Sequence, residues 1–142
     1  MQLNTTIPTS GRWRTAPSID TLQSLYDTSA DQWHDNLARL GQLHDYQLLF
    51  KHQAVRDRLR HLDQTARILD CGVGTGAFSA ALLDSIEQPA HISGIDISYP
   101  MLTHARQNLR NRCTTLDLRW GEIQRLPFAD DSFDAIIFAH VL

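Results

Sequence analysis

The sequence predicts an α/β fold, in which a parallel sheet follows a helical segment at the N-terminus. Three patterns support this fold class: apolar residues at helical spacing before Thr65, short apolar runs that alternate with helical stretches after it, and a glycine-rich turn at the end of one apolar run. Alternating strands and helices are typical of βαβ units, whose right-handed crossovers place the helices on the faces of the sheet.

The first part of the chain is expected to form a flexible arm, residues 1–18, and a helical cap, residues 19–63. The arm is rich in Thr, Ser, Pro and Gly and shows little periodicity. In the cap, apolar residues recur three and four positions apart, namely Leu22, Leu25, Tyr26, Trp33, Leu37 and Leu40. The cap is therefore expected to pack on the domain that follows it.

Start and stop signals divide the cap into expected helices. Ser29, with Gln32 three residues later, resembles a capping box, so a second helix is expected to begin there. Gly41 can end that helix. A third helix is expected to carry apolar residues from Leu43 to Leu59 on one face.

Residues 64–142 are expected to form the sheet domain. The apolar runs predict strands at 67–71, 91–96, 115–120 and 133–141, with helices at 76–85 and 98–110. The chain ends inside the last apolar run, whereas chain termini usually lie at polar surfaces. This ending predicts a fold that is incomplete at the C-terminus, with an open sheet edge through which the chain could self-associate.

Composition narrows the classes of partner. The 142 residues carry a net charge of -3 with an isoelectric point of about 6.1, so no basic excess indicates an obligate nucleic acid or anionic membrane partner. No window reaches the roughly 18 apolar residues of a membrane span, and no apolar leader is present, which predicts a cytoplasmic protein. Cys71 and Cys113 lack metal-ligand spacing, so they are interpreted as free thiols and no metal site is predicted.

The stretch "ILDCGVGTGAF", residues 68–78, is the strongest candidate for a ligand site. Gly72, Gly74 and Gly76 let the backbone turn sharply and let a ligand lie against it, while the next helix offers its amide-rich N-terminus. The spacing of Gly72, Gly74 and Ala77 also fits the dinucleotide pattern G-x-G-x-x-A, so the glycines alone do not choose the ligand.

Two acids next to this loop favour a cationic cofactor. Asp70 stands just before the first glycine of the loop, Gly72, with Cys71 between them. A carboxylate at that position would be unfavourable if it faced a pyrophosphate. A cofactor that has an ammonium group and no phosphate, such as S-adenosylmethionine, would be attracted to it. Asp96, at the end of the next strand, can accept hydrogen bonds from ribose hydroxyls, although it could also serve only as an acid at a helix N-terminus that Ser98 caps.

Three motifs, "ILDCGVGTG", "GIDISYPMLTHARQN" and "GEIQRLPFADDSFDAIIFAHVL", together resemble the class I S-adenosylmethionine-dependent methyltransferases, particularly those that act on small molecules, quinones and lipids. The resemblance covers residues 66–142. It implies a Rossmann-like parallel sheet, S-adenosylmethionine as the cofactor, and a chain that stops after the fourth strand of the family's fold.

The resemblance also implies roles for individual residues. Asp70 matches the acid that holds the methionine end of the cofactor, and Gly72, Gly74 and Gly76 match the loop beneath it. Asp96 matches the ribose-binding acid. Ile97 matches the apolar residue beside the adenine, Ile123 the residue whose backbone amide faces the adenine ring, and Glu122 stands where the family more often has Asp.

Methyl transfer from a sulfonium needs little acid or base chemistry, because the leaving group departs uncharged. The protein mainly has to align the acceptor and exclude water. His140, near the end of the fourth strand, is the candidate general base, with a structural role as the alternative. The cap aromatics Tyr26, Trp33 and Tyr46 could line an acceptor pocket or simply dock the cap.

Three functions stay open on these grounds. The first is the cofactor-binding half of a methyltransferase with a small-molecule acceptor. The second is a non-catalytic methyltransferase-like unit that pairs its open sheet edge with another chain. The third is a nicotinamide-dependent oxidoreductase, against which Asp70 and the segment "LPFADDSFD" both argue.

Overall fold

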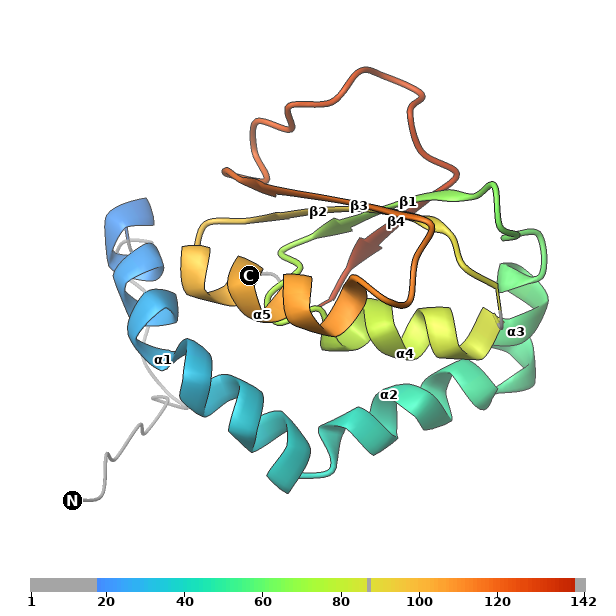
Figure 1. Ribbon diagram of the computed structural model, residues 1–142, viewed down its shortest axis with the longest axis horizontal. Helices are drawn as coiled ribbons and strands as arrows, with labels where there is room; N and C mark the ends of the chain where they lie inside the picture. The colour runs from blue at the N-terminus through green and yellow to red at the C-terminus, as the bar shows by residue number, and fades with distance from the viewer. Residues whose placement is uncertain (1–17, 87, 140–142) are drawn as a thin grey trace, which may run out of the picture.

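The computed structural model describes residues 18–86 and 88–139 (Figure 1). A helical segment precedes a sheet whose strands alternate with helices, as expected. In chain order the elements are α1 (Ile19–Arg39), α2 (Gln42–Lys51), α3 (Gln53–Leu59), β1 (Arg67–Cys71), α4 (Ala77–Ile86), β2 (His91–Asp96), α5 (Tyr99–Leu109), β3 (Thr115–Trp120) and β4 (Ala135–Phe138).

The sheet has the strand order β3-β2-β1-β4, and all neighbouring strands are parallel. From β1 the chain moves through β2 to β3 in one direction, and β4 then lies on the opposite side of β1. The topological switch point is therefore between β1 and β4. In open α/β sheets, ligands bind beyond the carboxyl ends of the strands at such a point, which here is the glycine-rich turn after β1.

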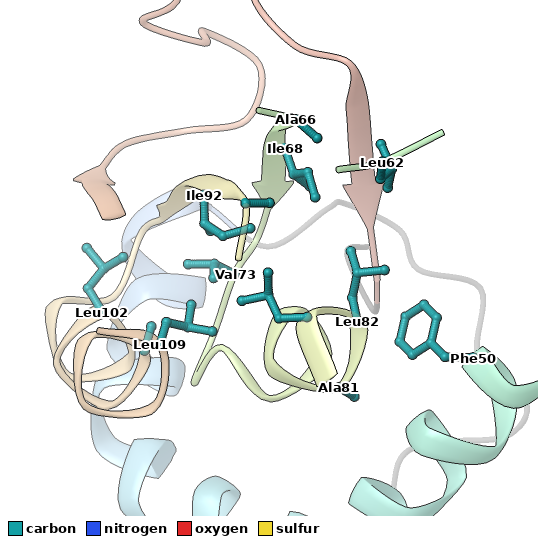
Figure 2. Packing of buried hydrophobic residues seen from close by; sticks show 13 residues of the cluster. Phe50, Leu62, Ala66, Ile68, Val73, Ala81, Leu82, Ile92, Leu102 and Leu109 are labelled. Atoms are coloured by element: carbon teal, nitrogen blue, oxygen red, sulfur yellow. The ribbon is translucent and has the colours of Figure 1, made fainter. Parts of the chain in front are cut away.

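The two faces of the sheet are covered differently. Helices α4 and α5 lie on one face, where the main core forms (Figures 1 and 2), with Ile68, Leu82, Ile92 and Leu109 among its most buried members. Over the other face arches the segment of residues 121–134 (Figure 1), whose apolar side chains pack on Leu69, Cys71 and Ile95. Because both faces are covered near β1, residues 68–71 of that strand are all buried and do not alternate between buried and exposed.

The cap lies on the outer side of the helical layer. Helix α2 packs against α4 through Phe50, which is buried, and Tyr46, and both rings meet Phe78 edge-on with centroids 5.1 Å apart. Helix α1 packs against α5, where the His34 and His104 rings stack at 4.9 Å. None of the helices among the described residues is both long and apolar enough to cross a membrane.

Two expectations about the cap helices are wrong. Helix α1 is continuous through Ser29, whose hydroxyl donates 2.7 Å back to the Leu25 carbonyl instead of capping a new helix. Burial of Ala30 in the chain interior outweighs the local capping signal. The expected third helix is two helices, because His52 has an extended backbone (ψ 130°) that ends α2 and begins α3. The expected end at Gly41 is confirmed, with φ at 73° directly after α1.

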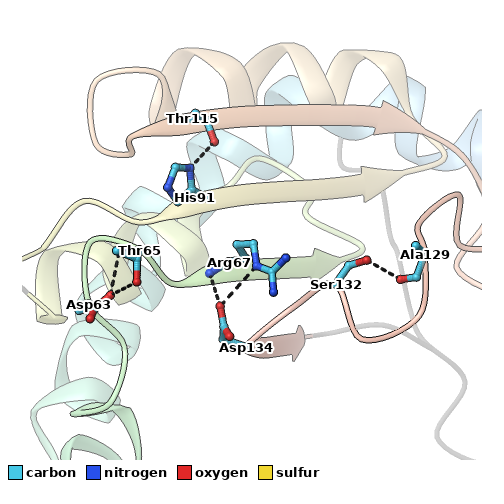
Figure 3. Close-up of polar contacts among 8 residues, drawn as sticks. All are labelled: Asp63, Thr65, Arg67, His91, Thr115, Ala129, Ser132 and Asp134. Carbon is cyan, nitrogen blue, oxygen red and sulfur yellow. Dashed lines mark hydrogen bonds and ion pairs between the residues drawn. The ribbon is translucent and has the colours of Figure 1, made fainter.

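Polar contacts fix the amino ends of the strands, away from the glycine turn (Figure 3). The Arg67 amide donates to the Asp134 carboxylate at 2.7 Å, and the Asp134 amide donates to the Arg67 carbonyl at 2.8 Å. This exchange holds the start of β4 beside β1. The Thr65 amide and hydroxyl both donate to Asp63, which holds the pKa of that carboxyl below its usual value. We assign these contacts to stability, since they lie at the end of the sheet opposite the switch point.

Candidate functional site

The turn after β1 is built on three glycines in the left-handed region. Gly72, Gly74 and Gly76 have φ angles of 72°, 52° and 75°, which L-residues adopt only with strain. The turn is tied to β2, because the amides of Gly72 and Val73 both donate to the Ile95 carbonyl, at 2.8 and 3.0 Å. This places the turn directly over the carboxyl ends of β1 and β2.

Gly76 and Gly74 serve different purposes. A Cβ on Gly76 would lie 2.9 Å from Leu109 Cδ1 and 3.2 Å from the Ala105 Cα, so Gly76 allows α5 to approach the turn closely. A Cβ on Gly74 would meet only the Gly72 carbonyl oxygen, at 4.0 Å. Gly74 therefore leaves its space open to a ligand, while Gly76 is a packing position.

Asp96 closes the site at the end of β2. Its carboxylate accepts the Gly74 amide at 2.8 Å and the Ser98 amide at 3.0 Å, so it holds both the glycine turn and the start of α5. Ser98 caps α5 as expected, since its hydroxyl accepts the Met101 amide. Burial raises the pKa of Asp96, backbone donors oppose that rise, and the negative charge of Asp27 on α1 adds to it.

Asp70 is the more deeply buried acid, with 1% of its surface exposed. The Ser79 hydroxyl donates to it at 2.6 Å. Burial raises the pKa of Asp70 to about 6, the Ser79 hydrogen bond opposes this, and the charge of Asp96 adds to it. A cationic group bound beside Asp70 would lower that pKa by favouring the carboxylate.

A cavity of about 410 Å³ lies between the glycine turn and the cap. Its only charged lining residues, among the described ones, are Asp70 and Asp96. Thr75, a residue 2% exposed in the same wall, has a hydroxyl with no hydrogen-bond partner among the residues that the structure describes. Two buried carboxylates and an unpaired hydroxyl fit a ligand that offers a positive charge and hydrogen-bonding groups.

The structure brings most of the expected site residues to this cavity. Its wall includes Asp70, Gly72, Gly74, Asp96, Ile97 and Ile123, together with the cap aromatics Tyr26, Trp33 and Tyr46. Glu122 does not line it, and its carbonyl instead accepts the Arg125 amide. His140 lies outside the described residues, so its expected role as a base stays a prediction.

Two residues of the wall have roles that the sequence analysis missed. Thr75 was not singled out, although a hydroxyl between two glycines of the turn was a usable signal. Its carbonyl also accepts the Asn108 side-chain amide at 2.8 Å, which fastens the turn to α5. Met101 is buried as core residues are, and in addition it lines the cavity.

Comparison with known proteins identifies the family of this chain. The family described as "Methyltransferase domain" matches residues 68–142, which is more than half of the chain and all of the sheet except Arg67. The chain belongs to the methyltransferase domain family. The resemblance inferred from the three motifs is thereby confirmed, as is the Rossmann-like α/β fold class.

Relatives of this methyltransferase-family chain differ in their acceptors. This chain is 30% identical over 122 residues to demethylmenaquinone methyltransferase of Lactiplantibacillus plantarum. The aligned region covers 83% of this chain and 49% of the relative. The chain is 42% identical over 69 residues to malonyl-[acyl-carrier protein] O-methyltransferase of Erwinia pyrifoliae, 48% of the chain and 23% of the relative. The chain thus spans about half the length, or less, of these curated relatives.

A solved structure shows the same fold at low sequence identity. Magnesium protoporphyrin IX methyltransferase from Synechocystis PCC 6803, with bound SAM, superimposes with a TM-score of 0.62 at 16% identity and covers 87% of this chain and 62% of that one. Because this agreement covers 87% of the chain and the family match only residues 68–142, the agreement in fold also includes residues before Ile68.

Proposed function

We propose that this chain binds S-adenosylmethionine as the cofactor-binding half of an enzyme that methylates a small-molecule acceptor. One observation carries the proposal: the cavity at the switch point has two buried carboxylates and, among its described lining residues, no basic group. A dinucleotide would place its pyrophosphate against this acidic wall, whereas a sulfonium and an ammonium group complement it.

Specific residues of the wall suit the parts of this cofactor. Asp96 would accept the ribose hydroxyls and Asp70 would face the ammonium group. Ile97 and Ile123 offer apolar contact to the adenine. The Thr75 hydroxyl, unpaired among the described residues, can donate a hydrogen bond to the carboxylate of the cofactor's methionine part. Bound there, the cofactor would supply an electrophilic methyl group on a sulfonium. The chain's own contribution is to orient the cofactor and to exclude water under the cap.

The acceptor we propose is uncharged and apolar. The cap side of the cavity is formed by Tyr26, Trp33, Leu37 and Tyr46, which offer aromatic and aliphatic surface and no cation to pair an anionic acceptor. Demethylmenaquinone, the acceptor in the name of one relative, has this character. His140 remains our candidate base for an acceptor that must lose a proton.

We also propose how the chain is divided, where the protein is located and what it contacts. Residues 1–18 would be an arm, 19–63 the cap and 64–142 the methyltransferase domain, in a cytoplasmic protein without a nucleic acid partner. The exposed Ile136 and Phe138 on β4 support our proposal that this sheet edge contacts further protein, including a second copy of the chain.

Isothermal titration of the purified chain tests the cofactor assignment. We expect S-adenosylhomocysteine to bind with a dissociation constant in the micromolar range and NADH to show no binding at the same concentrations, because of the acidic wall. Binding of NADH without S-adenosylhomocysteine would replace this proposal with the oxidoreductase alternative.

The affinity for S-adenosylhomocysteine is expected to rise with pH. Because the pKa of Asp70 is about 6, its carboxyl is mostly protonated at pH 5, and a bound ammonium group must displace that proton. The dissociation constant is expected to fall about tenfold between pH 5 and pH 7 and then to level off.

The matched variant is Asp70→Asn, which cannot titrate. Its affinity is expected to be weaker at pH 7 and to change little over the same range. A wild-type affinity that is flat between pH 5 and pH 7 would show that Asp70 does not face the ammonium group.

A further inference from the structure

Leucines of the cap lie on the molecular surface. Leu40 is 70% exposed, Leu48 49% and Leu49 46%, and Leu43 is also exposed. In α2, Leu48 lies opposite the buried Phe50, because two residues turn an α-helix by about 200°. Leu43, two turns before Phe50, lies on the side of α2 that Phe50 occupies, so we call only the other three exposed residues, Leu40, Leu48 and Leu49, the leucine surface.

Exposed cations accompany the leucine surface from the last residue of α1 to the residue after α3. They are Arg39, Lys51, Arg56, Arg58 and Arg60, and no ion pair engages any of them within the part of the chain that the structure describes. Lys51 follows Leu48 by three residues, so the two side chains are neighbours on one face of α2. Cationic and apolar side chains therefore share this part of the cap.

The charge of this region differs from that of the whole chain. Residues 39–61 contain five Arg or Lys and two Asp, a net charge of +3, whereas the complete chain carries -3. The preceding part of α1, residues 19–35, has four Asp and no Arg or Lys. The overall negative charge thus conceals a local basic segment next to exposed leucines.

We propose that the leucine surface and its neighbouring cations dock on an anionic lipid surface. Leucines can enter the interfacial region of a bilayer while Arg and Lys contact anionic headgroups, the combination used by amphipathic helices that lie on membranes. A nucleic acid would engage the cations and leave the leucines in water. A second copy of this region would bring two positively charged segments together.

This docking goes beyond the proposed methyl transfer and does not depend on it, because the leucine surface is separate from the cofactor cavity. The two are nevertheless linked through α2, which carries Tyr46 into the cavity wall and Leu48 on its outer side. Docking would bring the apolar wall of the cavity close to a lipid phase, from which an apolar acceptor can enter.

Vesicle flotation with the purified chain tests the proposal. We expect partition onto vesicles of phosphatidylcholine mixed with phosphatidylglycerol to exceed partition onto phosphatidylcholine alone by at least about tenfold. Added salt is expected to reduce this difference, because it screens the exposed cations. Equal partition onto both vesicles, or none onto either, would overturn the proposal.

Matched variants separate this surface from general properties of the chain. Leu40→Ser combined with Leu48→Ser is expected to lower partition about tenfold, whereas Leu25→Ser, at a leucine 55% exposed on the acidic part of α1, is expected to leave it unchanged. The circular dichroism spectra of these variants report whether the fold is retained.

The charge test compares two triple variants with the same change in net charge. Arg56→Gln with Arg58→Gln and Arg60→Gln is expected to lower partition about a hundredfold. Arg106→Gln with Arg110→Gln and Arg125→Gln removes exposed cations outside the cap and is expected to have little effect. An equal loss in both sets would mean that net charge, and not this surface, determines binding.

Discussion

Replacing Asp96 with alanine is expected to lower the affinity for S-adenosylhomocysteine by about a hundredfold or more. The proposed ribose contacts are two hydrogen bonds to a charged acceptor, each contributing about 1.5 kcal/mol or more, which together correspond to that factor. The variant also leaves the amides of Gly74 and Ser98 without their acceptor, so the turn keeps its bonds to the Ile95 carbonyl but loses its tie to the end of β2 through Gly74. Isothermal titration measures the change directly.

The control for this variant is Asp117→Ala. Asp117 lies on β3, partly exposed and paired with Arg119 away from the cavity, and its replacement is expected to leave the affinity unchanged. Thermal unfolding of both variants without ligand separates lost binding from lost folding. An Asp96→Ala chain that is folded and binds with unaltered affinity would remove Asp96 from the site.

Gly76→Ala is expected to be the most destabilising single substitution in the glycine turn. It forces an L-residue to φ 75°, at a cost of about 1 to 2 kcal/mol, and it drives a methyl group against Leu109 and Ala105 on α5. Overpacking of a close helix contact adds about 1 to 3 kcal/mol. We therefore expect a loss of about 3 kcal/mol in the free energy of unfolding, measured by urea denaturation.

Gly41→Ala isolates the conformational part of this cost. Gly41 has nearly the same φ, 73°, but nothing lies within 4 Å of the Cβ that alanine would add. Its substitution is expected to cost only about 1 to 2 kcal/mol. Similar losses in the two variants would show that α5 does not pack closely against the turn.

The sheet and its ligand turn could be predicted because their signals are local. The short strand expected at 67–71 leads directly into three glycines at alternate positions, a pattern that predicts a sharp turn open to a ligand. The observed β1 has these bounds, and the three glycines have positive φ angles. The start of α5 at Ser98 was predictable for the same reason, since a capping hydroxyl acts within three residues.

The errors arise where tertiary packing decides. Ser29 carries a capping signal, yet burial of its neighbour Ala30 keeps α1 helical through it. The break at His52 has no Gly or Pro to mark it, and apolar spacing continues across it. The unpaired state of the Thr75 hydroxyl depends on every group around it, so only the folded chain reveals it.

Helix α5 supports both walls of the cavity. On one side Asn108 holds the carbonyl of Thr75 and Leu109 abuts Gly76, while on the other side His104 contacts Asp31 at 2.8 Å and stacks on His34 of α1. The glycine turn and helix α1 of the cap thus both pack against α5. A small rotation of α5 would move both walls and so change the width of the cavity. Substitutions on the face of α5 that points away from the cavity can therefore alter ligand affinity without contacting any lining residue.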